Sequence, residues 1–201
     1  EEKDIGSYAD AVTYSYFGNK TITTGEGGSV IFKSKSIAEK ARILRDHGMS
    51  PNKRYRHDVI GFNYRMTNLQ AAIGVAQYEQ LDQIIEFRKK LVDRYKDRLS
   101  DLDVIFQAEH ESTSSSYWVF AAQFSSNDIK KIESELSKSE IEFRGCFEPM
   151  HLQPAFNKAK IIGNQNISMK IYKNILMLPT HNNLTLEDID YICEKIRKSV
   201  K

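Results

Sequence analysis

A long helical pattern in the middle of the sequence separates two differently built parts. From Thr67 to about Leu99, apolar residues recur at helical spacing, with room for a break near Asp82. The part before this helix reads as the remnant of an α/β domain, and the part after it mixes short strands with helices. We therefore expect an α/β remnant followed by a small α+β domain.

Two short segments before the helix have the composition of strands. Residues 11–17 ("AVTYSYF") and 29–32 ("SVIF") are rich in β-branched and aromatic residues and are bounded by glycine. We predict that both are buried strands. The connection between them is rich in glycine and threonine and contains one lysine, Lys20.

A helix and a long loop are predicted next. Ser36 and Glu39 form a capping-box pattern, and Gly48 predicts that the helix ends near His47. Residues 49–68 are polar and aperiodic, and at about 20 residues the segment is too long for a routine connection. Loops of that kind are usually functional or disordered.

The part after the long helix alternates between the two kinds of pattern. Three segments read as strands, three as helices, and Trp118 is expected in the core. The predicted strands are 103–106, 116–124 and 140–147. The first predicted helix is capped by Ser125 with Asp128 three residues on, and the second contains Ile171, Ile175 and Leu178 and stops at Pro179. The third begins at Thr185, with Asp188 completing the capping box, and its apolar face is Ile189, Ile192, Cys193 and Ile196.

Composition excludes some classes of function. A formal net charge of +2 over 201 residues gives little attraction to nucleic acid. Cys146 and Cys193 stand far apart without ligand spacing, which predicts a reducing compartment and no metal site. No apolar run approaches the roughly 20 residues that span a bilayer. We expect a cytoplasmic protein without a membrane segment and, because the sequence opens "EEKDIGSY", a piece of a longer chain.

Lys20 could serve one of several chemistries. A P-loop needs GxxxxGK[ST] leading into a helix, and a dinucleotide fingerprint needs GxGxxG, and neither spacing occurs here. A lysine withdrawn from water among aromatic residues can instead attack an aldehyde carbon, and Ser15 is near enough to bind a cofactor phosphate. The alternative, from these residues alone, is that Lys20 is a lysine in a glycine turn without a catalytic role.

Three sequence blocks resemble a known family. They are "TYSYFGNKTITTGEGGSV", "LRDHGMSPNKRYRHDVIGFNYRMTNLQAAIGVAQYEQLD" and "RGCFEPMHLQPAF". Together they are similar to the DegT/DnrJ/StrS family of sugar-nucleotide aminotransferases, which use pyridoxal phosphate on the fold-type-I scaffold. The resemblance implies that residues 1–80 are the C-terminal part of the large cofactor-binding domain and that residues 81–201 are the small C-terminal domain.

The resemblance also assigns cofactor-binding residues. Lys20 matches the lysine that binds the cofactor and then moves a proton during amino transfer. Ser15 matches the ligand of the cofactor phosphate. Asn63, in "GFNYRMT", is similar to the asparagine that reaches the phosphate from the partner subunit, which implies a homodimer with shared active sites. A dehydratase branch of the family carries histidine at the lysine position, so Lys20 indicates amino transfer.

Substrate residues and donor follow from the same likeness. Phe147 and His151, in "FEPMHLQ", match a loop that contacts the sugar nucleotide, and Arg65 resembles a basic residue of the same site. The blocks look most like enzymes that aminate a GDP-linked 4-keto-6-deoxy sugar, with glutamate as donor, in O-antigen or related glycan synthesis. Aminotransferases for UDP-linked sugars are the close alternative.

One departure from the family pattern affects catalysis. Such enzymes hold the pyridine nitrogen with an aspartate and pack the ring with another side chain, and both positions would precede Glu1. We therefore expect this chain to be inactive alone.

The alternative hypothesis is that the protein is not an enzyme. It would then be a non-catalytic interaction or regulatory module that binds an anionic partner through "KRYRH" (53–57).

Overall fold

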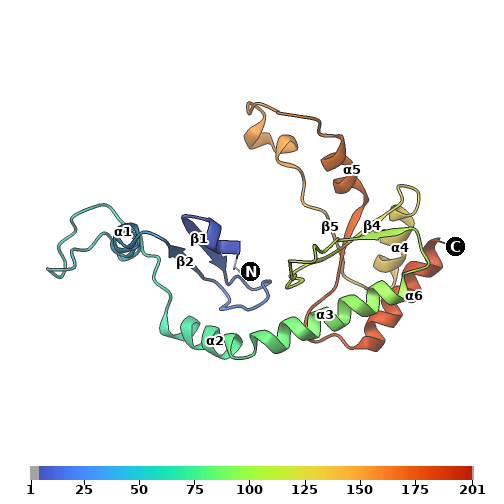
Figure 1. The fold of residues 1–201 in the computed structure, drawn as a ribbon, viewed down its shortest axis with the longest axis horizontal. Helices are drawn as coiled ribbons and strands as arrows, with labels where there is room; N and C mark the ends of the chain where they lie inside the picture. Colours follow the sequence, from blue (N-terminus) through green and yellow to red (C-terminus); the bar gives the residue numbers. More distant parts are fainter. Residues whose placement is uncertain (1–4, 201) are drawn as a thin grey trace. The chain divides into compact units, whose positions relative to one another are not determined.

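The computed structural model describes residues 5–200, which fall into two compact units (Figure 1). The units divide between Asp82 and Gln83, near the start of helix α3 (Leu81–Arg98). The first unit holds a two-stranded ribbon and two helices, and the second holds a four-stranded sheet with its helices.

The ribbon of the first unit contains both predicted strands. After a 3₁₀ turn, η1 (Ile5–Tyr8), strand β1 (Ala11–Ser15) pairs antiparallel with β2 (Gly28–Phe32). The prediction that these strands are buried is wrong, since Val30 and Ile31 are 48% and 60% exposed. Two strands make a ribbon rather than a layer, and the described residues supply no second layer to cover it.

Helix α1 (Lys35–Arg45) begins earlier than its sequence pattern indicates. Ser34, in extended conformation, caps the helix by accepting a hydrogen bond of 3.4 Å from the backbone N–H of Ile37. The predicted cap, Ser36, is wrong, because this residue already lies in the first turn. The chain leaves β2 only two residues before Ser34, so Ser34 is the last extended residue and the one placed to cap.

The segment after α1 folds back onto the end of that helix. His47 donates its backbone N–H to Phe62, and Phe62 and Tyr64 donate theirs to Leu44 and Arg45, at 2.7–3.0 Å. Isolated bridges join Asp46 to Asn63 and Met49 to His57. The predicted long loop is therefore confirmed as irregular, and its backbone is tied at both ends.

The long helical pattern forms two helices. Helix α2 (Asn68–Tyr78) starts at a complete capping box, in which Thr67 and Gln70 bond each other's backbone N–H groups. The helix breaks at Glu79 and Gln80, and α3 begins at Leu81. The predicted break is confirmed within three residues of its expected place.

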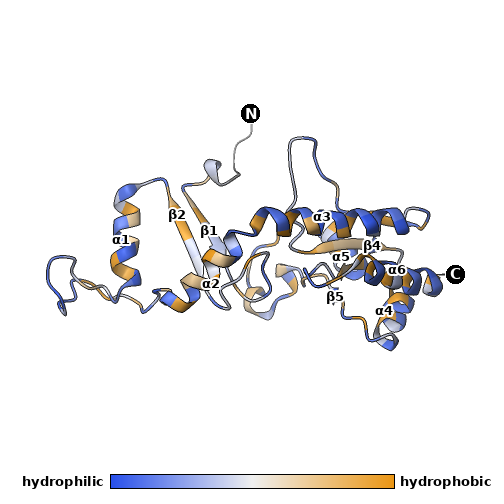
Figure 2. Cartoon of the chain, turned by 90° about the horizontal axis from the view of Figure 1, so that it is seen from below, coloured by the Kyte–Doolittle hydropathy of each residue, from blue (hydrophilic) through white to orange (hydrophobic). Residues whose placement is uncertain are grey.

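The second unit is built on an antiparallel sheet of order β3-β4-β6-β5. Helices α3 and α6 alternate hydrophilic and hydrophobic residues along their length (Figure 2), as expected for helices buried on one side. The sheet contains β3 (Val104–Phe106), β4 (Phe120–Phe124), β5 (Arg144–Gly145) and β6 (Ile175–Leu178); the other elements are α4 (Ile129–Lys138), η2 (Met150–Leu152), η3 (Pro154–Phe156), α5 (Asn166–Asn174) and α6 (Leu186–Val200).

The core of this unit joins α3, α4, α6 and the central strands. The fully buried large side chains include Tyr95, Phe120, Leu136, Leu176 and Ile196. The predicted face of α6 is confirmed, because Ile189, Ile192, Cys193 and Ile196 are all at most 4% exposed. The predicted capping box of α6 is confirmed too, since Thr185 and Asp188 exchange hydrogen bonds of 2.8 and 3.1 Å.

Other predictions in this unit are wrong. The helix expected up to Pro179 ends at Asn174, and residues 175–178 form β6, which pairs with both β4 and β5. Asp128 occupies the N-cap position of helix α4 without making a side-chain capping bond, so the predicted cap at Ser125 is wrong. Ser125 lies three residues earlier and donates its hydroxyl to the carboxylate of Asp128 at 2.6 Å. The strands predicted at 116–124 and 140–147 shrink to 120–124 and 144–145.

Candidate functional site

Lys20 lies in the connection between β1 and β2. Its backbone N–H donates to the carbonyl of Phe17 at 2.9 Å, and its side chain is half-buried. Tyr16 and Thr24 close the loop on either side of it, because Tyr16 donates to Gly27 and accepts from Thr24, both at 2.9 Å. The lysine backbone is thus held inside a closed turn at the end of the ribbon.

Gly27 explains part of the glycine content of this loop. Its φ is +149°, and a Cβ there would lie 2.6 Å from the hydroxyl oxygen of Thr24 and 2.7 Å from Cε of Met66. Thr24 is 4% exposed and donates its hydroxyl to the carbonyl of Glu26 at 2.8 Å. Any larger residue at position 27 would displace this buried contact and loosen the turn that carries Lys20.

Helix α2 supports the same loop from the other side. Gln77 accepts the backbone N–H of Thr23 at 3.4 Å, and Gln70 donates its amide to the carbonyl of Glu26 at 3.1 Å. A Cβ on Gly74 would lie 2.9 Å from Cγ2 of Thr24. These contacts were not predicted from the sequence, although an isolated glycine inside a helical pattern often marks a close approach.

Ser15 is the last residue of β1 and pairs with Gly28 at the end of the ribbon that carries the lysine loop. It is exposed, and its hydroxyl oxygen accepts a long hydrogen bond of 3.4 Å from the backbone N–H of Phe17. That bond leaves the hydroxyl proton available as a donor. An amine for an aldehyde and a hydroxyl for a phosphate therefore occur at one end of the ribbon, and these residues fit pyridoxal phosphate.

Asn63 and Arg65 lie on the segment that returns to α1. The backbone of Asn63 bridges to Asp46, which leaves its side chain exposed. Arg65 pairs with the carboxylate of Asp46 at 3.4 Å, and its side chain is 60% exposed. The side chain of Asn63 is therefore open to solvent, whereas the guanidinium of Arg65 is held by the carboxylate of Asp46.

The cationic cluster at residues 53–57 is partly neutralised. Nε of Arg56 lies 3.0 Å from Oδ1 of Asp58, and the guanidinium of Arg54 stacks 4.8 Å from the ring centroid of Tyr55. The hydrogen bond from Ser50, and then Arg56, hold the pKa of the Asp58 carboxyl below its usual value. Asp58 therefore stays charged at neutral pH and offsets the positive charge beside it.

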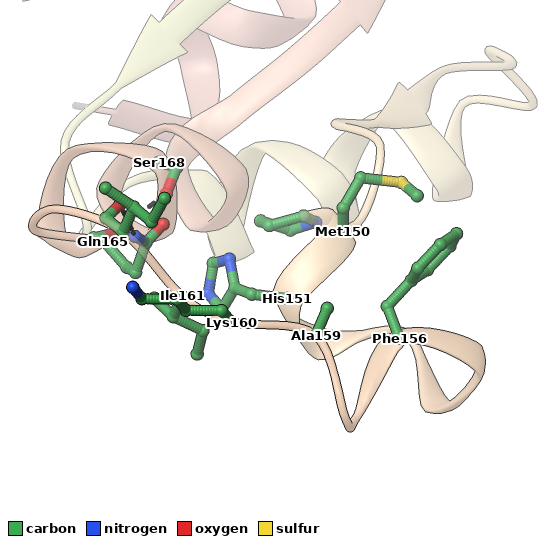
Figure 3. Close-up of a pocket in the computed structure, with 10 residues that line it drawn as sticks. Met150, His151, Phe156, Ala159, Lys160, Ile161, Gln165 and Ser168 are labelled. Atoms are coloured by element: carbon green, nitrogen blue, oxygen red, sulfur yellow. Dashed lines mark hydrogen bonds between the residues drawn. The ribbon is translucent and has the colours of Figure 1, made fainter.

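A pocket of about 470 Å³ opens in the second unit between η2 and the segment before α5 (Figure 3). His151 lies on η2, is half-buried and lines the pocket. The polar lining also includes Lys160, Gln165 and Ser168, while Met150, Phe156 and Ile161 supply apolar surface. Lys160 and Gln165 were not predicted from the sequence because they lie in an irregular stretch, and Ser168 was not predicted because nothing distinguishes it from the other polar residues of helix α5.

Phe147 is 66% exposed and lies just before this pocket in the chain. Its ring stacks on that of Trp118, with centroids 6.4 Å apart and planes 22° from parallel. The prediction that Trp118 is a core residue is wrong, because the side chain is only half-buried and stands outside the core cluster. The physical reason is the preceding residue, Tyr117, whose φ of +44° turns the chain.

Metal clusters and membrane-spanning helices are absent from the described part of the chain. Within residues 5–200, no group of three or more His, Cys, Asp or Glu side chains is placed to bind a metal ion. None of the helices in that range combines the length and apolar character needed to cross a bilayer.

Comparison with known proteins gives consistent matches. The model of the DegT/DnrJ/EryC1/StrS aminotransferase family matches residues 1–197. GDP-perosamine synthase of Caulobacter vibrioides is 37% identical in an alignment of 195 positions that covers 94% of this chain and 52% of that protein. GDP-perosamine synthase of Escherichia coli O157:H7 is 34% identical over 197 residues, or 98% of this chain and 53% of that protein.

A solved structure shows the same fold. The aminotransferase TlmJ from Streptoalloteichus hindustanus superposes with a TM-score of 0.90 over 98% of this chain and 54% of its own, at 22% identity. This chain spans about half the length of the relatives that it matches.

Proposed function

We propose that the whole protein is a pyridoxal phosphate-dependent sugar-nucleotide aminotransferase, because this chain belongs to the DegT/DnrJ/EryC1/StrS aminotransferase family. The observation that carries the proposal is the placement of Lys20 and Ser15 at one end of the β1–β2 ribbon. Bound pyridoxal phosphate would supply an electron sink for the substrate carbon that loses a proton.

The residues of this chain would bind the cofactor and move the proton. Lys20 holds the cofactor through Nζ and, once released, accepts and returns the proton that moves during amino transfer. Ser15 donates its hydroxyl to the cofactor phosphate. Thr24, Gly27 and Gly74 keep the turn rigid, so that Nζ of Lys20 starts from a fixed backbone.

The substrate that we propose is GDP-4-keto-6-deoxymannose, which would be converted to GDP-perosamine with glutamate as amino donor. The names and identities of the two relatives above support this choice over a UDP-linked sugar. Phe147 and His151 would contact the sugar nucleotide, and Arg65 would add positive charge near its phosphates. The product would enter O-antigen or related surface polysaccharide synthesis in the cytoplasm.

The assembly that we propose is a homodimer with shared active sites. The exposed side chain of Asn63 would reach the cofactor phosphate of the partner subunit. Residues 1–80 would complete the large cofactor-binding domain and residues 81–201 would form the small domain. The division between Asp82 and Gln83 supports this assignment.

The experiment uses the complete natural protein that contains this sequence. Incubated with pyridoxal phosphate, it is expected to show the absorption band of the covalently bound cofactor, and Lys20→Ala is expected to lose that band. Reduction with borohydride followed by peptide mapping should place the cofactor on the peptide that contains Lys20. Lys33→Ala is the matched control, because Lys33 is an exposed lysine just beyond β2 and should keep the band.

One outcome would contradict the assignment, and another would invalidate the control. Retention of the band in Lys20→Ala would show that another amine binds the cofactor. Equal loss of the band in Lys33→Ala would show that the ribbon tolerates no lysine substitution, and the result for Lys20 would then carry no information on its role.

A further inference from the structure

Arg88 is a buried cation on α3. Arg88 is 6% exposed, and burial lowers the pKa of its guanidinium from the usual value. Nε donates to Oδ1 of Asn182 at 3.3 Å, and Nη1 donates to the carbonyls of Tyr117 and Trp118 at 3.4 and 3.5 Å. These hydrogen bonds go to neutral oxygens, so Arg88 holds backbone in place at the cost of burying a charge.

The backbone that Arg88 grips has an unusual conformation. Tyr117 has a φ of +44°, which is costly for an aromatic residue, yet its side chain is 3% exposed. Its ring packs edge-on against Phe120 with centroids 6.3 Å apart, and its hydroxyl accepts a 3.1 Å hydrogen bond from Lys96. The turn is therefore fixed through its carbonyls and through its side chain.

The turn has a defined consequence for the next residue. Trp118 leaves the core, and its ring stacks on Phe147, which is otherwise exposed. An exposed phenylalanine on a loop can adopt several rotamers, whereas contact with an indole ring favours the rotamer that keeps the two rings stacked. One face of Phe147 is thus supported by Trp118, and the rest of its ring is available to a ligand.

We propose that Trp118 and Arg88 are positioning residues for sugar-nucleotide binding. Arg88 holds the turn at Tyr117 and Trp118, and Trp118 holds the ring of Phe147 so that it stacks on the nucleobase of the substrate. A base is the expected partner because a flat aromatic face stacks on a supported ring with little loss of freedom. The proposal rests on the proposed function, since it assumes a sugar nucleotide as substrate.

The first test uses the fluorescence of Trp118 in the complete protein. The signal of this residue is the part of the emission that Trp118→Phe removes. GDP is expected to quench that signal with saturation, and Phe147→Leu is expected to abolish the response. Mannose 1-phosphate, which lacks a base, is expected to leave the signal unchanged. Quenching by mannose 1-phosphate, or no quenching by GDP, would overturn the assignment of a base-stacking ring.

The second test separates positioning from a merely structural role. Trp118→Leu is expected to raise KM for the sugar nucleotide roughly three- to tenfold, the loss that one aromatic contact predicts. Its kcat should stay within about twofold of wild type, because the reacting atoms are untouched. Trp118→Phe keeps a ring behind Phe147 and should restore KM. An unchanged KM in Trp118→Leu, or a joint loss of kcat and of the cofactor band, would overturn the proposal.

Arg88 is tested by the same signals. Arg88→Met is expected to raise KM as Trp118→Leu does and to shift the fluorescence emission of Trp118, because the turn loses the hydrogen bonds from Arg88 to the carbonyls of Tyr117 and Trp118. A variant that folds and keeps both the KM and the emission of wild type would remove Arg88 from the proposal. These results are independent of Lys20, so a retained cofactor band in Lys20→Ala would contradict the proposed function while GDP quenching could still be observed.

Discussion

At the scale of single residues, Asp190 links two helices of the second unit through its carboxylate. Its carboxylate on α6 accepts hydrogen bonds of 2.8 and 2.6 Å from Arg94 on α3, and Nε of Arg98 lies 3.1 Å away. The hydrogen bond from Arg94 is the main cause that holds the pKa of Asp190 below its usual value of 3.8. Surface ion pairs contribute little, but this carboxylate is bound by two guanidinium groups at once.

The first prediction is that Asp190→Asn lowers the melting temperature at pH 7. A carboxyl whose pKa is lower in the folded state stabilises the fold above its unfolded pKa, and the stabilisation is lost as pH falls through the folded pKa. The melting temperatures of the two proteins should therefore converge below about pH 4. Circular dichroism melts across this pH range check the prediction.

The control for this prediction is Glu194→Gln. Glu194 is exposed on the same helix, and its substitution removes the same charge. It should change the melting temperature little at any pH. If Asp190→Asn melted like wild type at pH 7, the paired carboxylate would have no role in stability.

At the scale of elements, two glycines determine the path of the segment after α1. Gly48 has a φ of +68°, and a Cβ there would overlap the carbonyl of Val59. A Cβ on Gly61 would in turn overlap the backbone N of Gly48. The two ends of the long loop therefore touch backbone to backbone, which places Asn63 and Arg65 beside the end of α1.

The second prediction follows from this close approach. Gly48→Ala is expected to cost about 2 kcal/mol or more, because it combines a left-handed conformation with a steric overlap. Urea unfolding measures the cost. Gly145→Ala, on β5, is the control, since a Cβ there meets open space and should change stability by less than about 0.5 kcal/mol. Equal midpoints for the two variants would contradict the proposed role of Gly48.

At the scale of the whole molecule, the predicted family and fold class are confirmed. The family model matches residues 1–197, and the superposition on the aminotransferase TlmJ has a TM-score of 0.90. The two units differ in their interiors. Every buried apolar residue of the described chain lies from Ile84 onward, whereas Ile31, Leu69 and Val75 of the first unit are 59–80% exposed. The apolar surfaces of the first unit are therefore not covered by that unit's own residues.

The third prediction concerns the proposed shared active sites. Lys20→Ala and Asn63→Ala should each inactivate the complete protein, and mixed dimers of the two variants should regain activity. A mixed dimer carries both changes in one site and none in the other, so random mixing should restore about a quarter of wild-type sites. The assay is amino transfer after co-expression or subunit exchange. No recovery in purified mixed dimers would show that both residues serve the same subunit.

Local patterns determined much of this protein. The capping boxes of α2 and α6 and the apolar face of α6 were predictable, because such signals depend on residues three or four positions apart. The strands beside Lys20 were predictable from composition in the same way. The likeness that singled out Lys20 and Ser15 also lies within one continuous block of sequence.

Only the tertiary structure decided the remaining features. Residues 175–178 continue a helical pattern, yet they form β6 because β4 and β5 provide hydrogen-bonding partners on both sides. Trp118 lies outside the core, at a turn whose backbone carbonyls accept hydrogen bonds from Arg88, a residue distant in sequence. Gly74 and Gln77 support the Lys20 loop from a separate helix. Such effects depend on groups that folding brings together, and no local pattern of spacing or composition contains them.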